Sequence, residues 1–352
     1  MRTQTFLALA FVSLASIVAC SSSSSDDDVV NPEADGGGPD SAASGGTDAT
    51  TATETGTTSG TDASSSPDAT SDASTLDVST TGDGAVADSS VSEASPGACP
   101  LGAAPDAGAA GPVKYVFVVA MENHDSAEII GNMADAPYIN GTLLPCFAST
   151  SNFNDPLPLA IPSEPHYVYM EAGTNAFADA TFTSDNDPSA GNSTASTLHL
   201  STQLTASGVT WRSYQEGLDA AATGACPIDS SGFYAAKHDP FVFFQDVVGS
   251  PPSASNAGCA AHHKAFSALA GDLSAGVGSV AQYNFITPNL CDDMHGAGGC
   301  ANSNTIQAGD TWLSTNLPPM IAFANAHSGV IFLVWDEGDQ TLKIPFVAIG
   351  PS

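Results

Sequence analysis

Acidic and amide side chains follow three apolar runs of the sequence, and together they could hold a divalent cation. The residues that follow these runs are Glu122 and Asn123, Asp292 and Asp293, and Asp336 and Glu337. Carboxylates that lie close together raise one another's pKa unless a cation neutralises their charge. Oxygen ligands suit a hard ion such as Mg²⁺, Mn²⁺ or Ca²⁺, whereas thiolates suit zinc. The oxygen ligands expected for such an ion are those of Glu122, Asn123, Asp336 and Glu337.

A simpler explanation exists for any one of these acidic pairs. Carboxylates are also favoured at helix N-termini, where they cap free N–H groups and interact with the helix dipole. This explanation fits one acidic pair well. Three separate runs that all end in acidic residues favour the cation site.

Strands and helices alternate along the second part of the chain, and their order predicts how these side chains meet. Continuous runs of β-branched and aromatic residues predict buried strands over 114–120, 283–287, 329–335 and 344–349. Helices are expected over 196–207, 260–273 and 310–326. This alternation predicts an α/β fold with a mostly parallel sheet and helices on both faces, which binds its ligand beyond the carboxyl ends of the strands.

Six short motifs resemble those of the phosphoesterase family, in the same order. They are Glu122-Asn123, Ser-Glu-Pro-His-Tyr at 163–167, Trp-Arg-Ser-Tyr-Gln-Glu at 211–216, Lys-His-Asp-Pro at 237–240, 285–289 with 292–295, and Trp-Asp-Glu-Gly at 335–338. That family joins acid phosphatases and bacterial phospholipases C within the alkaline phosphatase superfamily. The resemblance covers nearly all of 113–351 and is stronger to the acid phosphatases. It implies an alkaline phosphatase-like fold.

The resemblance implies catalytic roles for three residues. Ser163 occupies the position of the nucleophile, which in the superfamily lies at a helix N-terminus. His295 is placed to contact the transferred phosphoryl group or to act as a general acid toward the leaving oxygen. His166 stands where the family usually has asparagine, and its imidazole could replace the amide as a phosphate donor.

The resemblance also implies the residues that hold the phosphate and the metal. The phosphate-binding residues expected from it are Lys237, His238, Asp292 and Asp293. Glu122, Asn123, Asp336 and Glu337 are expected to surround Ser163 as ligands of a divalent ion, which is Mg²⁺, Mn²⁺, Ca²⁺ or Zn²⁺. A serine hydroxyl is a weak nucleophile, so a cation that lowers its pKa is the expected partner.

These residues predict a metal-dependent phosphomonoesterase that works through a phosphoserine intermediate. One alternative is a phosphodiesterase of the phospholipase C type. A second is a surface-displayed binding protein whose catalytic site has decayed. A phosphate ester is the expected substrate, and no protein partner is implied.

The N-terminal part has the layout of an exported lipoprotein. Residues 1–19 form a predicted signal peptide, and Ile17-Val18-Ala19-Cys20 resembles a bacterial lipobox, in which Cys20 becomes lipidated. An ordinary signal peptide is the alternative. Residues 20–98 are rich in Ser, Thr, Ala, Gly and Asp and predict a disordered tether before a folded domain over 99–352. The expected location is the bacterial outer membrane or cell surface, through the lipid anchor.

The overall charge excludes one class of function. The chain has 352 residues with Lys+Arg 6 and Asp+Glu 38, a formal net charge of −32. Six basic residues cannot build the cluster that holds a nucleic-acid backbone, so no nucleic-acid partner is expected. The tether contributes 15 acidic residues and no basic residue, which leaves the folded domain with 23 acidic and five basic residues.

Six cysteines follow Cys20, and an even number in an exported chain predicts up to three disulfides with 15 possible connectivities. Proximity in the sequence favours pairs between Cys291 and Cys300 and between Cys226 and Cys259. The family continues beyond the last apolar run with a segment that carries another histidine and a packing helix. We therefore expect a domain that is short at its C-terminal end, with an exposed sheet edge.

Overall fold

The computed structural model of the chain describes residues 99, 101, 111–218 and 225–350. The predicted signal peptide over 1–19, the lipidation site Cys20 and most of the region before the domain, through residue 98, lie outside the described residues. Within the described part, no helix combines the length and the apolar character that a membrane crossing requires.

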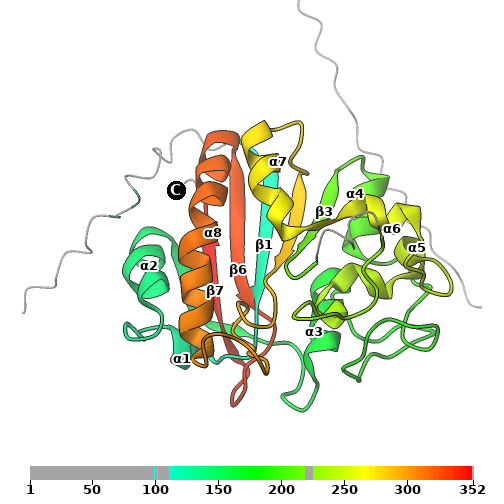
Figure 1. Cartoon of the computed structure of the whole chain (residues 1–352), viewed down its shortest axis with the longest axis horizontal. Helices are drawn as coiled ribbons and strands as arrows, with labels where there is room; N and C mark the ends of the chain where they lie inside the picture. The colour runs from blue at the N-terminus through cyan, green and yellow to red at the C-terminus, as the bar shows by residue number, and fades with distance from the viewer. Residues whose placement is uncertain (1–98, 100, 102–110, 219–224, 351–352) are drawn as a thin grey trace, which may run out of the picture. The chain divides into compact units, whose positions relative to one another are not determined.

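Seven strands form one sheet in the order β2-β7-β6-β1-β5-β3-β4 (Figure 1). Their bounds are β1 Tyr115–Met121, β2 Ala148–Asn154, β3 Trp211–Gln215, β4 His263–Ala265, β5 Tyr283–Thr287, β6 Gly329–Trp335 and β7 Lys343–Ile349. Neighbouring strands are parallel from β6 through β1, β5 and β3 to β4, whereas β7 is antiparallel to both β6 and β2. The predicted α/β fold with a mostly parallel sheet is confirmed.

The four predicted apolar runs all form strands, and their register sets the position of the acidic residues. Strands β1 and β6 pair along their whole length, so that Met121 lies beside Trp335. The next residues, Glu122 and Asp336, therefore leave the sheet side by side. The side chains of these apolar runs are mostly buried on one face of the strands and buried or half-buried on the other.

Helices cover both faces of the sheet (Figure 1). On one face, α8 (Thr305–His327) and α7 (Leu269–Ala275) pack their apolar side chains on Phe117 and Val119 of β1. On the other face, α3 (Ser163–Ala172) and α4 (Leu200–Ala206) pack on the side that carries Phe285 of β5. Because side chains alternate along each strand, each strand contributes to a separate apolar layer on each face of the sheet.

Two of the predicted helices differ from the observed ones. The helix expected over 196–207 is the shorter α4, whose N-cap is His199. The helix expected over 260–273 is wrong, because the chain forms α6 (Ala257–His262), strand β4, the 3-10 helix η5 (Phe266–Ala268) and then α7. Strand β4 pairs with β3, and this tertiary pairing overrides the local helical pattern.

Short elements and three disulfides complete the described fold. The short elements are α1 Ser126–Ile129, η2 Ile139–Leu143, α2 Leu144–Cys146, η3 Ala236–His238, η4 Pro240–Phe243 and α5 Gln245–Val248. The disulfides join Cys99 to Cys146, Cys226 to Cys259, and Cys291 to Cys300. The two pairings favoured by sequence proximity are confirmed.

Candidate active site

The carboxyl ends of β1, β5 and β6 meet at one edge of the sheet. The Asp336 N–H donates to the carbonyl of Met121 over 3.0 Å, and the Glu122 N–H donates to the carbonyl of Asp293 over 2.8 Å. These two bonds fix the backbone of three residues that carry carboxylates. The structure therefore brings Glu122, Asp293 and Asp336 together, as the sequence predicted for the carboxyl edge.

Ser163 is the first residue of α3 and points into this group of acidic side chains. Pro162 precedes it in an extended conformation, and Pro165 fits the first turn, where its missing N–H costs nothing. The Ser163 Oγ lies 2.8 Å from Glu337 Oε1, 3.3 Å from Glu122 Oε2 and 3.5 Å from Asn123 Oδ1. A hydroxyl carries one hydrogen and can serve only one of these three acceptors at a time.

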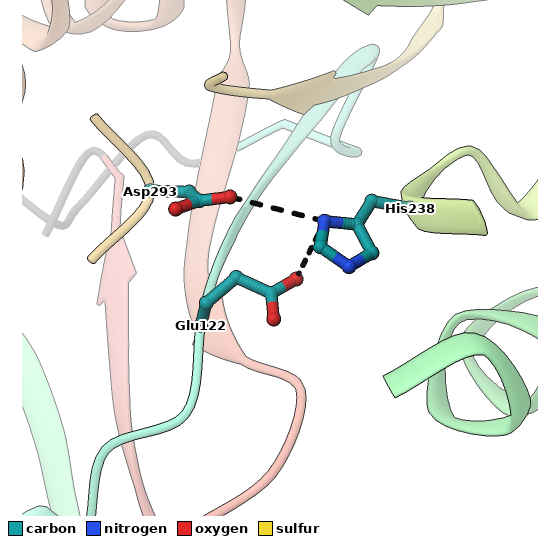
Figure 2. Close-up of side chains that lie close together, drawn as sticks. All are labelled: Glu122, His238 and Asp293. Atoms are coloured by element: carbon teal, nitrogen blue, oxygen red, sulfur yellow. Dashed lines mark ion pairs between the residues drawn. The ribbon is translucent and has the colours of Figure 1, made fainter. Parts of the chain in front are cut away.

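Glu122, His238 and Asp293 form a first buried cluster (Figure 2). The His238 Nδ1 lies 3.2 Å from Glu122 Oε1 and 3.8 Å from Asp293 Oδ2. Asp293 Oδ2 and His238 Nε2 are buried and have no hydrogen-bond partner in the described structure. A buried polar atom without a partner is costly unless a ligand satisfies it.

His166, Asp336 and Glu337 form a second buried cluster on the other side of Ser163. Asp336 Oδ1 accepts the Asn123 N–H over 3.1 Å, while its Oδ2 is buried without a hydrogen-bond partner among the described residues. Both ring nitrogens of His166 face acceptors, because Nδ1 lies 2.9 Å from the Pro162 carbonyl and Nε2 lies 3.0 Å from Asp155 Oδ2.

Burial makes the ionised form of these carboxyl groups unfavourable. It raises the pKa of Glu122, and the neighbouring Asp293 carboxylate raises that pKa further. Burial likewise raises the pKa of Asp336, with Glu122 and Glu337 adding to the shift. The pKa of Asp293 and that of Glu337 are also raised by burial. A positive charge in this site would favour the ionised form of these carboxyl groups.

The two clustered histidines differ in protonation. Burial lowers the pKa of His238 well below its usual value, and the nearby charges of Lys237 and His295 lower it further. Burial alone would also lower the pKa of His166, but the hydrogen bond to Asp155 and the charges of Asp155, Asp336 and Glu337 together raise it. His238 is thus a neutral imidazole, the form that can ligate a metal.

The residues present fit a divalent cation. The unpartnered oxygens of Asp293 and Asp336, the three acceptors around Ser163 Oγ and the raised carboxyl pKa values all call for positive charge at this edge. The donor set is rich in carboxylate and amide oxygens, which suits a hard ion. The predicted ligands that contact Ser163 are Glu122, Asn123 and Glu337, and Asp336 joins them through the Asn123 backbone.

Lys237 lies in η3 and forms an ion pair with Asp185. The other oxygen of Asp185 accepts the N–H of Glu164, the residue after Ser163, over 3.3 Å. Asp185 therefore ties Lys237 to the beginning of α3. Because Glu164 already donates and Pro165 has no N–H, the first turn of α3 leaves few amides free for a phosphate.

His295 lies beside one of the two buried clusters, whereas Asp292 lies outside both. The backbone N–H of His295 donates to Asp293 Oδ1 over 2.8 Å, and its ring centre lies 5.9 Å from that of His238. His295 thus lies beside the first cluster. Asp292 accepts a hydrogen bond from Asn289 over 2.8 Å and belongs to neither cluster.

The sequence analysis assigned no role to three residues of the site, which are Tyr167, Asp155 and Asp185. The Tyr167 hydroxyl donates to Glu122 Oε1. The one available signal was its position four residues after Ser163, which places both side chains on one face of a helix. Asp155 and Asp185 lie in loops before and after α3, and their spacing gives no sign of their partners.

Comparison with known proteins gives a family and remote structural likenesses. Residues 153–342 match the model of the Phosphoesterase family. A solved structure of a protein in the alkaline phosphatase superfamily from Vibrio parahaemolyticus is 13% identical, with a TM-score of 0.43 over 73% of this chain and 65% of that chain. No curated protein matches. The family match spans more than half of the sequence and includes Ser163, both acidic residues after β6 and the residues around His238 and His295, so the chain belongs to the phosphoesterase family.

Proposed function

We propose that the chain is a metal-dependent phosphomonoesterase that forms a phosphoserine at Ser163. One observation carries the proposal: Ser163 Oγ, at the start of α3, faces Glu122, Asn123 and Glu337 within 2.8–3.5 Å. Membership of the phosphoesterase family supports a phosphoric ester hydrolase. The monoester substrate and the metal dependence are part of the proposal.

Glu122, Asn123, Asp336 and Glu337 would hold the cation next to Ser163. When bound there, a divalent cation supplies the positive charge that lowers the pKa of a serine hydroxyl and offsets charge on phosphoryl oxygens. The chain's own contribution is to keep these ligands buried and fixed by backbone hydrogen bonds. Lys237, held by Asp185, provides a further positive charge for the phosphate.

The reaction has two displacements at phosphorus. In the first, Ser163 Oγ bonds to phosphorus while the bond to the alcohol oxygen breaks. The hydroxyl proton passes to Glu337, and His295 gives a proton to the leaving alcohol. In the second, water loses a proton to His295 and attacks phosphorus, the Ser163 Oγ–phosphorus bond breaks, and Ser163 recovers its proton from Glu337. Inorganic phosphate is released.

The nucleophile is tested with p-nitrophenyl phosphate and the Ser163→Ala variant. We expect kcat to fall roughly a thousandfold or more, as for the loss of other serine nucleophiles. Ser193→Ala is the matched control, because Ser193 is buried and hydrogen-bonded to Gln245 away from the clusters. Removal of metal by a chelator should abolish activity, and Mg²⁺, Mn²⁺, Ca²⁺ or Zn²⁺ added singly should identify the ion. If neither Ser163→Ala nor chelation changes the activity, the catalytic proposal fails and the alternative of a binding protein is favoured.

The same assay separates monoester from diester hydrolysis. The two substrates are p-nitrophenyl phosphate and p-nitrophenyl phosphorylcholine, which share a leaving group. A higher kcat/KM for the monoester is expected. A preference for the choline diester would instead favour a phosphodiesterase of the phospholipase C type.

We also propose that the chain is exported and anchored to a bacterial membrane through lipidated Cys20. The lipobox at 17–20 and the acidic Ser- and Thr-rich region after it support this proposal. The anchor would hold the domain near a membrane surface.

A further inference from the structure

Tyr167 connects the nucleophile's helix to an acidic ligand of the site. It lies on α3 four residues after Ser163, so both side chains are on the same face of the helix. The ring is fully buried, and the hydroxyl donates to Glu122 Oε1. The other oxygen of that carboxylate, Oε2, lies 3.3 Å from Ser163 Oγ. Helix α3 thus contacts both oxygens of Glu122.

The ring of Tyr167 also supports His238. The two rings lie parallel, with centres 4.9 Å apart and an angle of 9° between their planes. His238 Nδ1 lies 3.2 Å from the same Glu122 Oε1 that accepts the Tyr167 hydroxyl. One side chain therefore fixes the position of a carboxylate through its hydroxyl and of an imidazole through its ring.

Apolar side chains hold Tyr167 in this place. It packs in a buried cluster with Ala120, Trp211, Phe241 and Phe285, and the edge of its ring meets Phe285 at 6.3 Å between centres. Because the packing fixes the ring, the hydroxyl has a defined direction toward Glu122. This arrangement is that of a second layer around a metal site, where outer residues orient the ligands.

We propose that Tyr167 is a positioning residue that orients Glu122 for cation binding and holds His238 against the same carboxylate. The inference rests on the proposed metal-dependent function. Loss of the hydroxyl removes a donor from Glu122 Oε1 and lets the carboxylate rotate away from the orientation in which Oε2 faces Ser163. Loss of such an outer hydrogen bond typically weakens metal affinity by about 10–100-fold.

The test is Tyr167→Phe in the full chain, which keeps the ring and its packing and removes only the hydroxyl. Mn²⁺ affinity of metal-stripped protein is measured by titration calorimetry, with the thermal unfolding midpoint measured alongside. The matched control is Tyr214→Phe, because Tyr214 is also fully buried and donates to a carboxylate, that of Asp272, over 2.6 Å. We expect roughly a 10–100-fold loss of Mn²⁺ affinity in Tyr167→Phe and no loss in Tyr214→Phe.

A second comparison shows whether Tyr167 acts through Glu122 and covers the case in which Tyr167→Phe does not fold. In Glu122→Gln, the buried group carries no charge, so removal of its phenol partner leaves no unpaired carboxylate. Adding Tyr167→Phe to Glu122→Gln should change Mn²⁺ affinity by less than about threefold. The affinity is measured by paramagnetic resonance of free Mn²⁺, with Mn²⁺ added up to millimolar concentration. An equal loss in both backgrounds overturns the proposal.

Mn²⁺ affinity and esterase activity together distinguish failure of this inference from failure of the proposed function. Unchanged Mn²⁺ affinity in Tyr167→Phe overturns the role of Tyr167 and leaves the hydrolase proposal standing. Reduced affinity in a chain without esterase activity supports Tyr167 and counts against the hydrolase. A wild-type chain that binds no Mn²⁺, Mg²⁺, Ca²⁺ or Zn²⁺ overturns both.

Discussion

At the scale of single residues, the site places many negative groups in a small buried space. Burial raises the pKa of Glu122 and Asp336; the Asp293 carboxylate raises that of Glu122 further, and the Glu122 carboxylate that of Asp336. The two described cations nearest this chemistry are Lys237, which pairs with Asp185, and His166, which pairs with Asp155. A bound cation would offset this negative charge, and Lys237 is the proposed source of positive charge for the phosphate.

Lys237→Met tests that role. We expect KM for p-nitrophenyl phosphate to rise and kcat/KM to fall by roughly 10–100-fold, because one positive charge is removed from the phosphate site. The control is Lys264→Met, since Lys264 forms a comparable ion pair with Asp272 over 2.6 Å away from the two clusters. Steady-state kinetics of the wild type and both variants measure these values. An equal KM in the wild type and in Lys237→Met would show that Lys237 does not contact the phosphate.

At the scale of elements, a buried histidine ties three helices together. His199, the N-cap of α4, lies 3.0 Å from Glu171 of α3 and 2.9 Å from Asp246 of α5. Both ring nitrogens face carboxylates, which can only accept, so both must carry hydrogen. Burial by itself would lower the pKa of His199, but the hydrogen bonds to Asp246 and Glu171 raise it to about 9.

This arrangement predicts how stability depends on pH. A histidine whose pKa is higher in the folded chain stabilises the fold fully below its unfolded pKa near 6.5 and loses that contribution as pH rises to about 9. The contribution is on the order of 3 kcal/mol. Urea unfolding at pH 6 and at pH 9.5 should show this loss in the wild type, measured as the free energy of unfolding.

His199→Gln supplies the comparison. It should be less stable than the wild type at pH 6 and should approach it at pH 9.5, because the difference comes from the charged imidazole. A parallel loss of stability in both proteins between the two pH values would contradict the prediction.

At the scale of the whole molecule, the net charge of −32 divides between two regions with different roles. The region after Cys20 holds 15 acidic residues and no base, and it is rich in Ser, Thr, Ala and Gly. The folded domain holds the remainder, and several of its carboxylates converge on Ser163. Part of the charge on the domain therefore lies at the candidate cation site.

The proposed anchor makes a prediction at this scale. Wild-type chain produced in a bacterium that processes lipoproteins should be found in the membrane fraction, and Cys20→Ser should release it, because the lipid is attached to the thiol. Ser22→Ala, two residues beyond the cysteine, is the control and should remain with the membrane. Fractionation followed by detection with an antibody measures this. Equal distribution of wild type and Cys20→Ser would exclude the anchor.

Part of the fold could be predicted because its signals are local. Three strands are continuous apolar runs, at Tyr115–Met121, Tyr283–Thr287 and Gly329–Trp335. Such runs are typical of strands in the interior of a parallel sheet. Strand β3 was not predicted, because Trp211–Gln215 contains polar residues that find partners only in the fold. Gln215, for example, donates to Ser213 and to Thr287.

The sequence by itself predicted which residues belong to the candidate site: the acidic residues after three strands, Ser163 and the motifs around it. It did so because strand ends and motif order are properties of the chain alone. The tertiary structure decided which atoms meet. Only the pairing of β1 with β6 sets Glu122 beside Asp336, and only the packing of α3 on the sheet brings the Tyr167 hydroxyl to Glu122. Contacts between segments distant in the sequence depend on packing, and packing has no local signal.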